Sequence, residues 1–377
     1  MKFIADKAIP HINEAFSTIG EVTLMPAHEI TSTAVKNADG LLVRTTTRIS
    51  QELLDNSKIR FVGTATIGTD HVDGSFLDRK GIHLVSAPGC NATAVGEYVL
   101  TSLLAIQQKS GCRLQGRTMG IIGCGNTGRA VKRKVEAIGI NCILNDPPLA
   151  EKSEPGLYLK MEELLPRADI LSVHVPLTRT GKYPTFHLID DQVLQAVKPG
   201  TILINTSRGE TVDGAAVKNH RNQLSSINLD VWEDEPVIDP DLIPCIDIAT
   251  PHIAGYSIEG KIKATEILYR EACEYFKMPQ TWKGKDALSE YGLPVITVSE
   301  EGRAVESVVS QVYNILEDDA NLRRYSEQDN PGEYFAALRN NYQFRREFSS
   351  YTVMCQEFIS QNTRQLLSRI GFNISDG

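Results

Sequence analysis

The sequence predicts an α/β protein built on parallel, doubly wound sheets. Two observations support this fold class. Short apolar runs alternate along the chain with segments of helical periodicity, and one apolar run is followed at once by three spaced glycines and a helical segment. Strands that alternate with helices form parallel sheets, because each helix returns the chain to the same edge. At 377 residues the chain is long enough for two or three domains with substantial cores.

The glycine segment lies in the middle of this pattern. An apolar run at 118–122 precedes glycines at the spacing G-x-G-x-x-G, and a helix and a second strand then lead to Asp146. Gly123 permits a tight turn, Gly125 lets the backbone approach a pyrophosphate, and Gly128 lets the helix pack on the strand. The helix N-terminus then faces the phosphates. Asp146 suits a ribose 2′-hydroxyl and would repel a 2′-phosphate, so we expect a Rossmann-type domain that binds NAD.

Composition and charge exclude several other classes of function. The formal charge of −8, without a dense Lys/Arg block, argues against nucleic-acid binding. No apolar run approaches the length that spans a membrane, and charge interrupts the apolar N-terminus too early for a signal peptide. The seven cysteines are scattered and form no C-x-x-C pair. We therefore expect reduced thiols, no metal site and a cytoplasmic protein.

The N-terminal part predicts a smaller, flavodoxin-like α/β domain. The pattern places a helix at 9–19. It places strands at 2–5, 22–24, 40–44 and 60–66. Thr45 and Thr66 lie at the ends of the last two of these strands. Ligands of parallel sheets meet the loops beyond the strands' carboxyl ends, so both threonines are candidate substrate contacts, although threonines there also commonly cap turns.

A long apolar helix at 95–106, which must be buried, precedes the glycine segment. After Asp146 the alternation of strands and helices resumes. The further strands are predicted at 170–175, 201–205, 227–231 and 247–250. Arg208, Glu235 and His252 follow the last three of them. Side chains so placed converge on one crevice in a doubly wound fold.

Beyond Met278 the periodicity changes, and residues 286–377 predict a third domain of the α+β type. One helical face is predicted from Val305, Val308, Val309, Val312 and Leu316. Further elements are predicted as a helix at 334–345, a strand at 352–354 and a helix at 358–370. The predicted domains are therefore 1–94 with 256–285, which would bind the substrate, 95–255, which would bind NAD, and 286–377, which would form a homodimer.

Three motifs at the strand ends carry a resemblance to a known family. They are Asn205-Thr206-Ser207-Arg208-Gly209, Asp230-Val231-Trp232-Glu233-Asp234-Glu235-Pro236 and Pro251-His252-Ile253-Ala254-Gly255. On these motifs the chain resembles the D-isomer-specific 2-hydroxyacid dehydrogenases. One branch of that family is similar more narrowly, at 61–73, 87–92, 251–261, 331–335 and 338–347. The resemblance implies a cytoplasmic, homodimeric enzyme that oxidises a small phosphorylated 2-hydroxy acid with NAD.

The resemblance implies catalytic roles for Arg208, Glu235 and His252. Oxidation of a 2-hydroxy acid needs a base for the hydroxyl proton, and histidine has an unperturbed pKa of about 6.5. A carboxylate can orient that histidine and stabilise its cationic form, and an arginine can hold the substrate carboxylate through two parallel hydrogen bonds. Glu233 lies equally near along the chain. Glu235 is preferred because the family uses the residue directly before the proline.

The resemblance also implies two sets of binding residues. Those for the substrate are Thr45, Thr66 and Tyr256. Those for the cofactor are Gly123, Gly125, Asn126, Thr127, Gly128, Asp146, Val175, Thr206, Ser207, Arg208, Asp230 and Gly255. The chain departs from the branch at Thr45, where serine is commoner, and at Val175, where a threonine contacts the cofactor.

The substrate phosphate also needs hydrogen-bond donors. Arg44 is a candidate donor, and Arg345 or Arg346 could be delivered by the partner subunit, unless both only form ion pairs within the third domain.

Two alternative functions stay open. The first alternative function is a dehydrogenase of another D-2-hydroxy acid, such as 3-phosphoglycerate, glycerate or lactate. The second is a non-catalytic scaffold that senses NAD on the same fold.

Overall fold

The computed structural model describes residues 1–298 and 300–376. It divides into two compact units. The first unit consists of Met1–Asn91 and Ser257–Gly292, and the second consists of Ala92–Tyr256 and Leu293–Gly377. The roles predicted for 1–94 with 256–285, for 95–255 and for 286–377 stay predictions.

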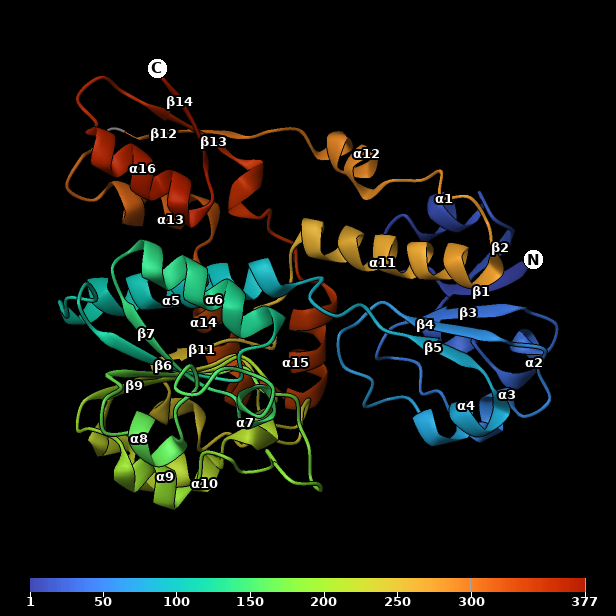
Figure 1. Ribbon diagram of the computed structural model, residues 1–377, viewed down its shortest axis with the longest axis horizontal. Coiled ribbons are helices and arrows are strands. Elements are labelled where there is room, and N and C mark those ends of the chain that lie inside the picture. The colour runs from blue at the N-terminus through green and yellow to red at the C-terminus, as the bar shows by residue number, and fades with distance from the viewer. Residues whose placement is uncertain (299, 377) are drawn as a thin grey trace. The chain divides into compact units, whose positions relative to one another are not determined.

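The first unit contains a parallel five-stranded sheet with the order β2-β1-β3-β4-β5 (Figure 1). Its strands are β1 (Lys2–Asp6), β2 (Glu21–Met25), β3 (Gly40–Val43), β4 (Phe61–Thr64) and β5 (His83–Val85). Its α-helices are α1 (Ile12–Phe16), α2 (Ser32–Val35), α3 (Gln51–Leu54), α4 (Gly74–Lys80), α11 (Ile258–Phe276) and α12 (Gly284–Leu288). The order 2-1-3-4-5 is that of flavodoxin-like sheets, so this predicted fold class is confirmed.

The helix α11 belongs to this first unit although its sequence follows the whole central part of the chain. Its residues Leu268 and Tyr269 are buried in one core with Phe3 and Phe16 from the N-terminal segment. The rings of Phe16 and Tyr269 meet edge to face with centroids 5.8 Å apart. Aromatic pairs of this geometry add stability beyond the burial of their area, so the returning helix completes the core of the unit.

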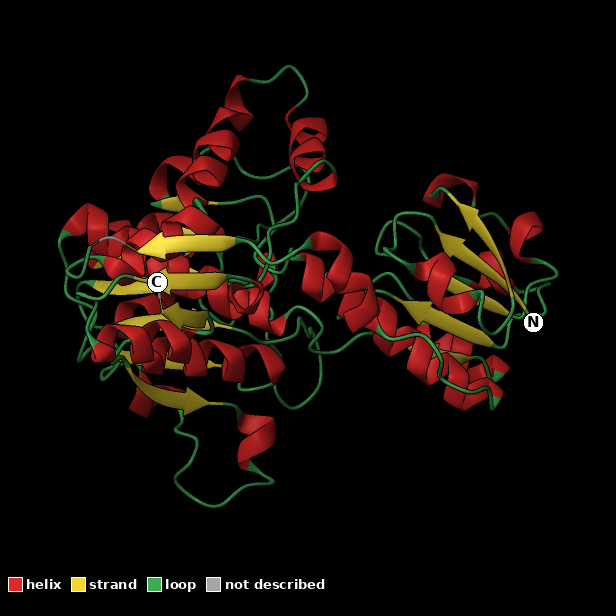
Figure 2. Ribbon diagram, turned by 90° about the horizontal axis from the view of Figure 1, so that it is seen from above, coloured by secondary structure: helices red, strands yellow, loops and turns green. Residues whose placement is uncertain are grey.

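The second unit contains a parallel six-stranded sheet with the order β11-β10-β9-β8-β6-β7. Figure 1 shows its strands between two layers of helices, and Figure 2 gives the view from above with helices and strands in separate colours. Its strands are β6 (Thr118–Ile122), β7 (Asn141–Asn145), β8 (Ile170–Val173), β9 (Thr201–Asn205), β10 (Leu224–Leu229) and β11 (Ile248–Ala249). The helices within this part are α5 (Ala92–Ser110), α6 (Asn126–Ala137), α7 (Pro147–Ala150), α8 (Met161–Leu164), α9 (Asp191–Ala196) and α10 (Gly214–Asn219). The strand order reverses between β6 and β8, and dinucleotides bind beyond the strand ends at such a point.

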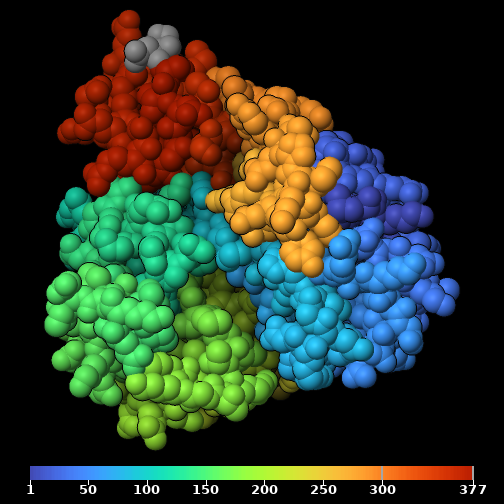
Figure 3. All heavy atoms as spheres, turned by 45° about the vertical axis from the view of Figure 1, so that its right-hand side comes forward, coloured from blue at the N-terminus to red at the C-terminus, as the bar shows by residue number. Residues whose placement is uncertain are grey.

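A third, smaller sheet with the order β12-β13-β14 lies in the same unit. It is parallel, and its strands are β12 (Val295–Val298), β13 (Thr352–Cys355) and β14 (Asn373–Asp376). The helices of this C-terminal segment are α13 (Ala304–Val312), α14 (Ile315–Arg323), α15 (Pro331–Asn340) and α16 (Gln361–Ile370). Figure 3 shows the red C-terminal segment directly on the teal surface of α5 and α6. One continuous apolar core joins the two parts, so the segment is an additional layer of the unit.

The structure corrects the prediction of a single helical face from Val305 to Leu316. The helix α13 ends at Val312, Tyr313 is extended, and α14 begins at Ile315. Val308 and Val309 are buried within the chain's own core, whereas Leu316 is 47% exposed on the second helix. The buried part of this face therefore needs no partner subunit, contrary to the prediction.

Two predicted helices are shorter in the structure, and the structure contains strands that were not predicted. The helix predicted at 9–19 covers only Ile12–Phe16, and the helix predicted at 334–345 ends at Asn340. The strands β5, β12 and β14 were not predicted. Within the described residues, every helix is too short or too polar to cross a membrane.

A buried ion pair joins α5, α6 and the C-terminal segment. Nζ of Lys134 lies 2.9 Å from Oε1 of Glu97, which is only 1% exposed, and donates to the carbonyl oxygen of Ile370. Glu97 also accepts a hydrogen bond from the N–H of Phe348 at 3.1 Å. Burial raises the pKa of Glu97, and the charge of Lys134 opposes that rise. The pair therefore ties the additional layer to the dinucleotide-binding part.

We expect Lys134→Met to destabilise the second unit by about 3 kcal/mol at neutral pH, because it leaves a buried carboxylate without its cation. This loss of stability should be smaller at acidic pH, because a protonated Glu97 needs no cation. Because the pKa of Glu97 is raised, its protonation occurs at a higher pH than that of an ordinary carboxyl group. Urea denaturation at two pH values measures both effects.

The matched control is Lys132→Met, on the same helix, because Lys132 pairs with Glu136 where both side chains are more than one third exposed. It should cost less than about 1 kcal/mol. Equal losses in the two variants would contradict the structural role of the buried pair.

Candidate active site

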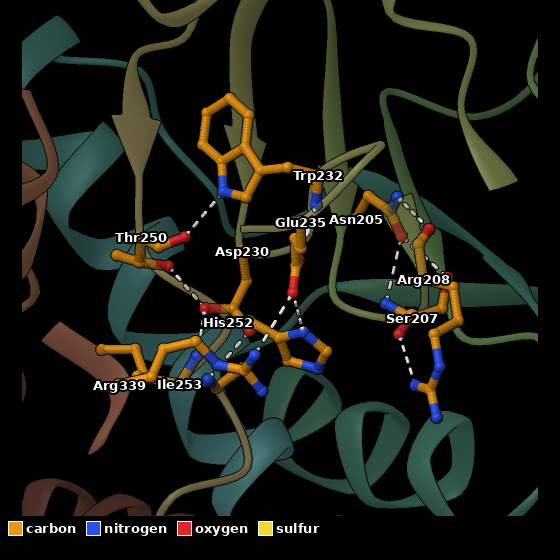
Figure 4. A network of polar contacts seen from close by, with 11 residues as sticks. Asn205, Ser207, Arg208, Asp230, Trp232, Glu235, Thr250, His252, Ile253 and Arg339 are labelled. Atoms are coloured by element: carbon orange, nitrogen blue, oxygen red, sulfur yellow. Dashed lines mark hydrogen bonds and ion pairs between the residues drawn. The ribbon is translucent and has the colours of Figure 1, made fainter. Parts of the chain in front are cut away.

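Polar side chains lie at the carboxyl ends of neighbouring strands in the six-stranded sheet (Figure 4). His252, which follows β11, places Nδ1 2.7 Å from Oε2 of Glu235, which follows β10. The two side chains are 29% and 16% exposed. When Nδ1 donates its proton to a carboxylate, the other ring nitrogen, Nε2, carries the lone pair of a base. The pair is therefore suited to general acid–base chemistry.

The turn that carries His252 is held by the buried carboxylate of Asp230. Its Oδ1 accepts hydrogen bonds from the Thr250 hydroxyl at 2.6 Å and from the N–H of Ile253 at 2.8 Å. Its Oδ2 accepts a third from the N–H of Ala254 at 2.9 Å. His252 has φ of 57°, in the left-handed region that costs a non-glycine residue about 1–3 kcal/mol. The three hydrogen bonds offset that strain.

Burial raises the pKa of Asp230, and nearby groups oppose that rise. Those groups are His252, the Thr250 hydroxyl and the two backbone N–H groups. Both carboxylate oxygens are thus already used inside the chain. The predicted contact of Asp230 with the cofactor stays a prediction.

Glu235 is ionised at neutral pH. Burial acts to raise its pKa, but the positive charges and hydrogen bonds around it lower the pKa below the ordinary value. These come from His252, from Arg339 and from the N–H of Trp232, which lies 2.9 Å from Oε1. An ionised carboxylate beside an imidazole stabilises the imidazolium form, as a catalytic histidine requires once it has taken a proton.

The competing glutamate, Glu233, is engaged elsewhere. Its Oε1 lies 2.6 Å from Nε2 of His187, and its Oε2 accepts a hydrogen bond from the N–H of Gly214 at the start of α10. Of the two glutamates, the structure therefore brings Glu235 to His252.

Arg208 follows β9, on a loop that Asn205 shapes. The Asn205 side chain donates to the carbonyl oxygen of Arg208 and accepts from the N–H and hydroxyl of Ser207. Nη1 of Arg208 donates to the carbonyl oxygen of Ser207 at 2.8 Å. In Figure 4 the guanidinium extends away from the strand ends on the same side as the His252 ring. A planar guanidinium in this place can bind a carboxylate bidentately.

The glycine turn after β6 has the geometry that a pyrophosphate requires. Gly123 has φ of 89°, and a Cβ on it would lie 2.6 Å from the carbonyl oxygen of His174. A Cβ on Gly128 would lie 2.1 Å from the carbonyl oxygen of Gly123, so the helix packs where only glycine fits. A Cβ on Gly125, by contrast, would meet nothing within 4 Å. This open space lies at the N-terminus of α6, where the exposed Asn126 and the half-buried Thr127 begin the helix.

Asp146 is fixed at the end of β7. Its Oδ2 accepts a hydrogen bond from the N–H of Cys124 at 2.8 Å, and its Oδ1 accepts one from the N–H of Leu149 at 3.0 Å. Each carboxylate oxygen has a second lone pair, and the residue is partly exposed. A ribose hydroxyl can therefore donate to Asp146, and the glycine turn and this acid together fit NAD.

The other predicted cofactor residues follow β8, β9 and β11. Val175 borders the glycine turn, because a Cβ on Gly123 would lie 2.9 Å from its Cγ1. The Thr206 hydroxyl lies 3.1 Å from Nδ1 of His174, whose pKa burial lowers to about 3. That histidine is neutral and structural. Gly255 is half-buried just past the His252 turn, and Ser207 is bound to Asn205.

Two of the predicted substrate residues lie in the first unit. Thr45 is exposed just past β3, and Thr66 follows the adjacent β4, with its hydroxyl 2.7 Å from that of Thr64. Arg44 donates through Nε to the buried Asp6 at 2.9 Å. These four residues, Thr45, Thr66, Arg44 and Asp6, lie at the carboxyl edge of one sheet. Parallel sheets bind ligands at this edge.

The structure contradicts the proposed delivery of Arg345 to a substrate phosphate. Arg345 is 8% exposed and donates to the carbonyl oxygens of Ala94, Ile253 and Ala254. Its guanidinium also lies 4.3 Å from the ring centroid of Tyr313. These internal contacts occupy the side chain. Arg346 is half-buried, and its role stays a prediction.

The third predicted substrate residue, Tyr256, lies in the second unit. Its ring meets those of Tyr342 and Phe344 edge to face, with centroids 5.8 and 5.7 Å away. Sequence analysis missed a further residue here, Arg339, whose Nη1 lies 3.5 Å from Oε2 of Glu235. Its position in the segment 338–347 was the only signal, because no local pattern connects α15 with a loop about a hundred residues earlier.

Comparisons with known proteins agree with this geometry. Residues 97–254 match the family described as "D-isomer specific 2-hydroxyacid dehydrogenase, NAD binding domain", and residues 293–371 match "Domain of unknown function (DUF3410)". The chain is 42% identical to the erythronate-4-phosphate dehydrogenase of Escherichia coli (strain ATCC 8739), over 99% of this chain and 98% of that relative. It is 40% identical to the enzyme of the same name from Shewanella sp. (strain ANA-3), over 99% of both chains.

A solved structure gives the same result for the fold. The NAD⁺-bound 3-phosphoglycerate dehydrogenase of Entamoeba histolytica is similar with a TM-score of 0.62 and 26% identity, over 74% of this chain and 95% of that one. The predicted family, the Rossmann-type fold and NAD as the cofactor are thereby confirmed. The chain belongs to the erythronate-4-phosphate dehydrogenases, a branch of the NAD-dependent D-isomer-specific 2-hydroxyacid dehydrogenases.

Proposed function

We propose that the protein oxidises 4-phospho-D-erythronate at C2 to (R)-3-hydroxy-2-oxo-4-phosphooxybutanoate, a step in the biosynthesis of pyridoxal 5′-phosphate. The observation that carries this proposal is the contact of 2.7 Å between Nδ1 of His252 and Oε2 of Glu235. It leaves Nε2 as the base, in a chain whose full-length relatives are named for this substrate.

Each catalytic residue has one task in this proposal. His252 takes the proton of the C2 hydroxyl on Nε2, and Glu235 stabilises the resulting imidazolium. Arg208 holds the substrate carboxylate and so fixes C2 relative to the base. NAD, when it is bound, accepts the hydride that leaves C2. One proton and one hydride thus leave the alcohol, and a ketone remains.

The remaining site residues are assigned to binding. Thr45 and Thr66, at the sheet edge of the first unit, and Tyr256, in the second, contact the substrate in this proposal. Arg44 supplies donors to the phosphate, because its Nε is fixed on Asp6 and its position follows β3. The cytoplasm is the proposed location. No disulfide joins the seven cysteines, all of which lie in the described part of the chain.

We also propose that the protein is a homodimer that pairs through the C-terminal segment. The support is an exposed apolar surface there: Leu293, Val295, Met354 and Phe358 are 72%, 57%, 38% and 58% exposed. Val295 and Met354 lie on the same face of paired strands. Exposed apolar side chains that share a face are typical of interfaces, and twofold pairing is the commonest assembly. Light scattering at micromolar concentration should give twice the mass of 41.6 kDa, and a monomeric mass would contradict the pairing.

The substrate is tested by NADH fluorescence with the full-length protein. We expect 4-phospho-D-erythronate to be oxidised with a far higher kcat/KM than D-erythronate, 3-phosphoglycerate, D-glycerate or D-lactate. Preference for one of the other acids would replace the proposed substrate with that acid. Absence of NADH formation with every acid, despite NAD binding, would favour the non-catalytic scaffold.

The same assay tests the base. His252→Ala should lower kcat by about 10²–10⁴-fold, the usual effect of losing a positioned acid–base group. Calorimetric titration with NAD is the control, because the variant should bind the cofactor as the wild type does. Near wild-type turnover would remove His252 from the mechanism.

A further inference from the structure

The C-terminal segment places a cation at the Glu235–His252 pair (Figure 4). Nη1 of Arg339, on α15, lies 3.5 Å from Oε2 of Glu235, the oxygen that also lies 2.7 Å from Nδ1 of His252. We propose that Arg339 is a positioning residue of this site: it fixes the Glu235 carboxylate and weakens the hold of that carboxylate on the His252 proton. The proposal rests on the proposed function of His252 as the base.

The helix α15 is anchored to the loop that carries Glu235. The backbone N–H of Ile238 donates to the Tyr325 hydroxyl at 2.9 Å, just before α15 begins. Phe335, on α15, is fully buried in one core with Trp232 and Ile238. Gly332 lies so close that a Cβ on it would be 3.1 Å from a methyl carbon of Val237. The Arg339 backbone is therefore held on the same loop that its side chain contacts.

Among the described residues, the polar contact of the Arg339 side chain is its ion pair with Glu235. Its Nε is buried and has no hydrogen-bond partner among the described residues. The side chain as a whole is 27% exposed. A buried N–H without a partner is costly, so this conformation is maintained by the ion pair and by the packing of α15. Glu235 is thereby surrounded by three donors: His252, Arg339 and the N–H of Trp232.

The sign of the effect follows from the charges at the site. The charged or titratable groups at the pair are His252, Glu235, Arg339 and Asp230. Further out, Arg345 lies on the carbonyl oxygens of Ile253 and Ala254, and Asp318 interacts with Asp230. The carboxylates of Glu235 and Asp230 favour a proton on the imidazole, and the guanidinium of Arg339 opposes it. Removing the guanidinium leaves the Glu235 charge to act on His252 alone. The imidazolium form then persists to higher pH, and the neutral base is available only above that pH.

The decisive experiment is an NMR titration of the His252 ring in protein labelled with carbon-13 histidine. The chain has eight histidines, and His252→Gln identifies the signal. We expect Arg339→Met to move the titration midpoint of His252 upward by about 0.5–1 pH unit, the effect of a partly exposed charge. Arg339→Lys should return it most of the way. The control is Arg324→Met, because Arg324 is exposed in the turn between α14 and α15.

An unchanged midpoint in Arg339→Met, or the same shift in Arg324→Met, would overturn the proposal. This readout needs no turnover, so failure of the proposed function, seen as an inactive wild type, is distinguished from failure of the Arg339 role.

Kinetics with 4-phospho-D-erythronate give the second readout. In Arg339→Met the ascending limb of kcat/KM for oxidation should move to higher pH with the NMR midpoint, so that activity below the limb falls about 3–10-fold. A loss confined to KM for the phosphorylated acid, without a pH shift, would assign Arg339 to the phosphate instead and contradict its positioning role.

Discussion

The geometry of the site depends on the buried carboxylate of Asp230. It accepts hydrogen bonds from Thr250, Ile253 and Ala254, and these span the turn in which His252 adopts its left-handed conformation. Without acceptors in that place, the strained turn would lose the interactions that compensate it. The position of the imidazole relative to Glu235 is thus fixed before any ligand arrives. Pre-organisation of this kind lowers the cost of reaching the reactive arrangement.

The C-terminal segment contacts this arrangement at two distinct places. In the last turn of α6, Lys134 connects Glu97 on α5 with the carbonyl oxygen of Ile370. Near the strand ends, α15 packs on the loop after Glu235 and brings Arg339 to the carboxylate. A segment that matches a domain of unknown function is therefore continuous with the core of the dinucleotide-binding part. Its contribution to the site is electrostatic as well as structural.

The sequence predicts those features whose cause is local. The glycine turn, Asp146 and the three strand-end motifs lie within short segments, where strand, turn and helix signals occur in order, and the structure places them together. The break between α13 and α14, the burial of Arg345 and the contact of Arg339 with Glu235 depend on tertiary packing across distant segments. Helical periodicity continues through the break, so pattern alone joined two helices. An arginine in a polar helix looks the same whether it is solvated or buried.

We infer that Asp230 fixes the turn on which His252 acts as the base. Replacement by asparagine keeps the volume but puts an N–H₂ group where one backbone N–H now donates. The most direct measurement is rapid-mixing NADH formation in the first turnover of Asp230→Asn, with NAD and 4-phospho-D-erythronate both saturating, so that weakened binding does not contribute. We expect a hydride-transfer rate lower by about 10²-fold, the effect of misplacing a catalytic group by roughly an ångström. A first-turnover rate equal to that of the wild type would contradict it.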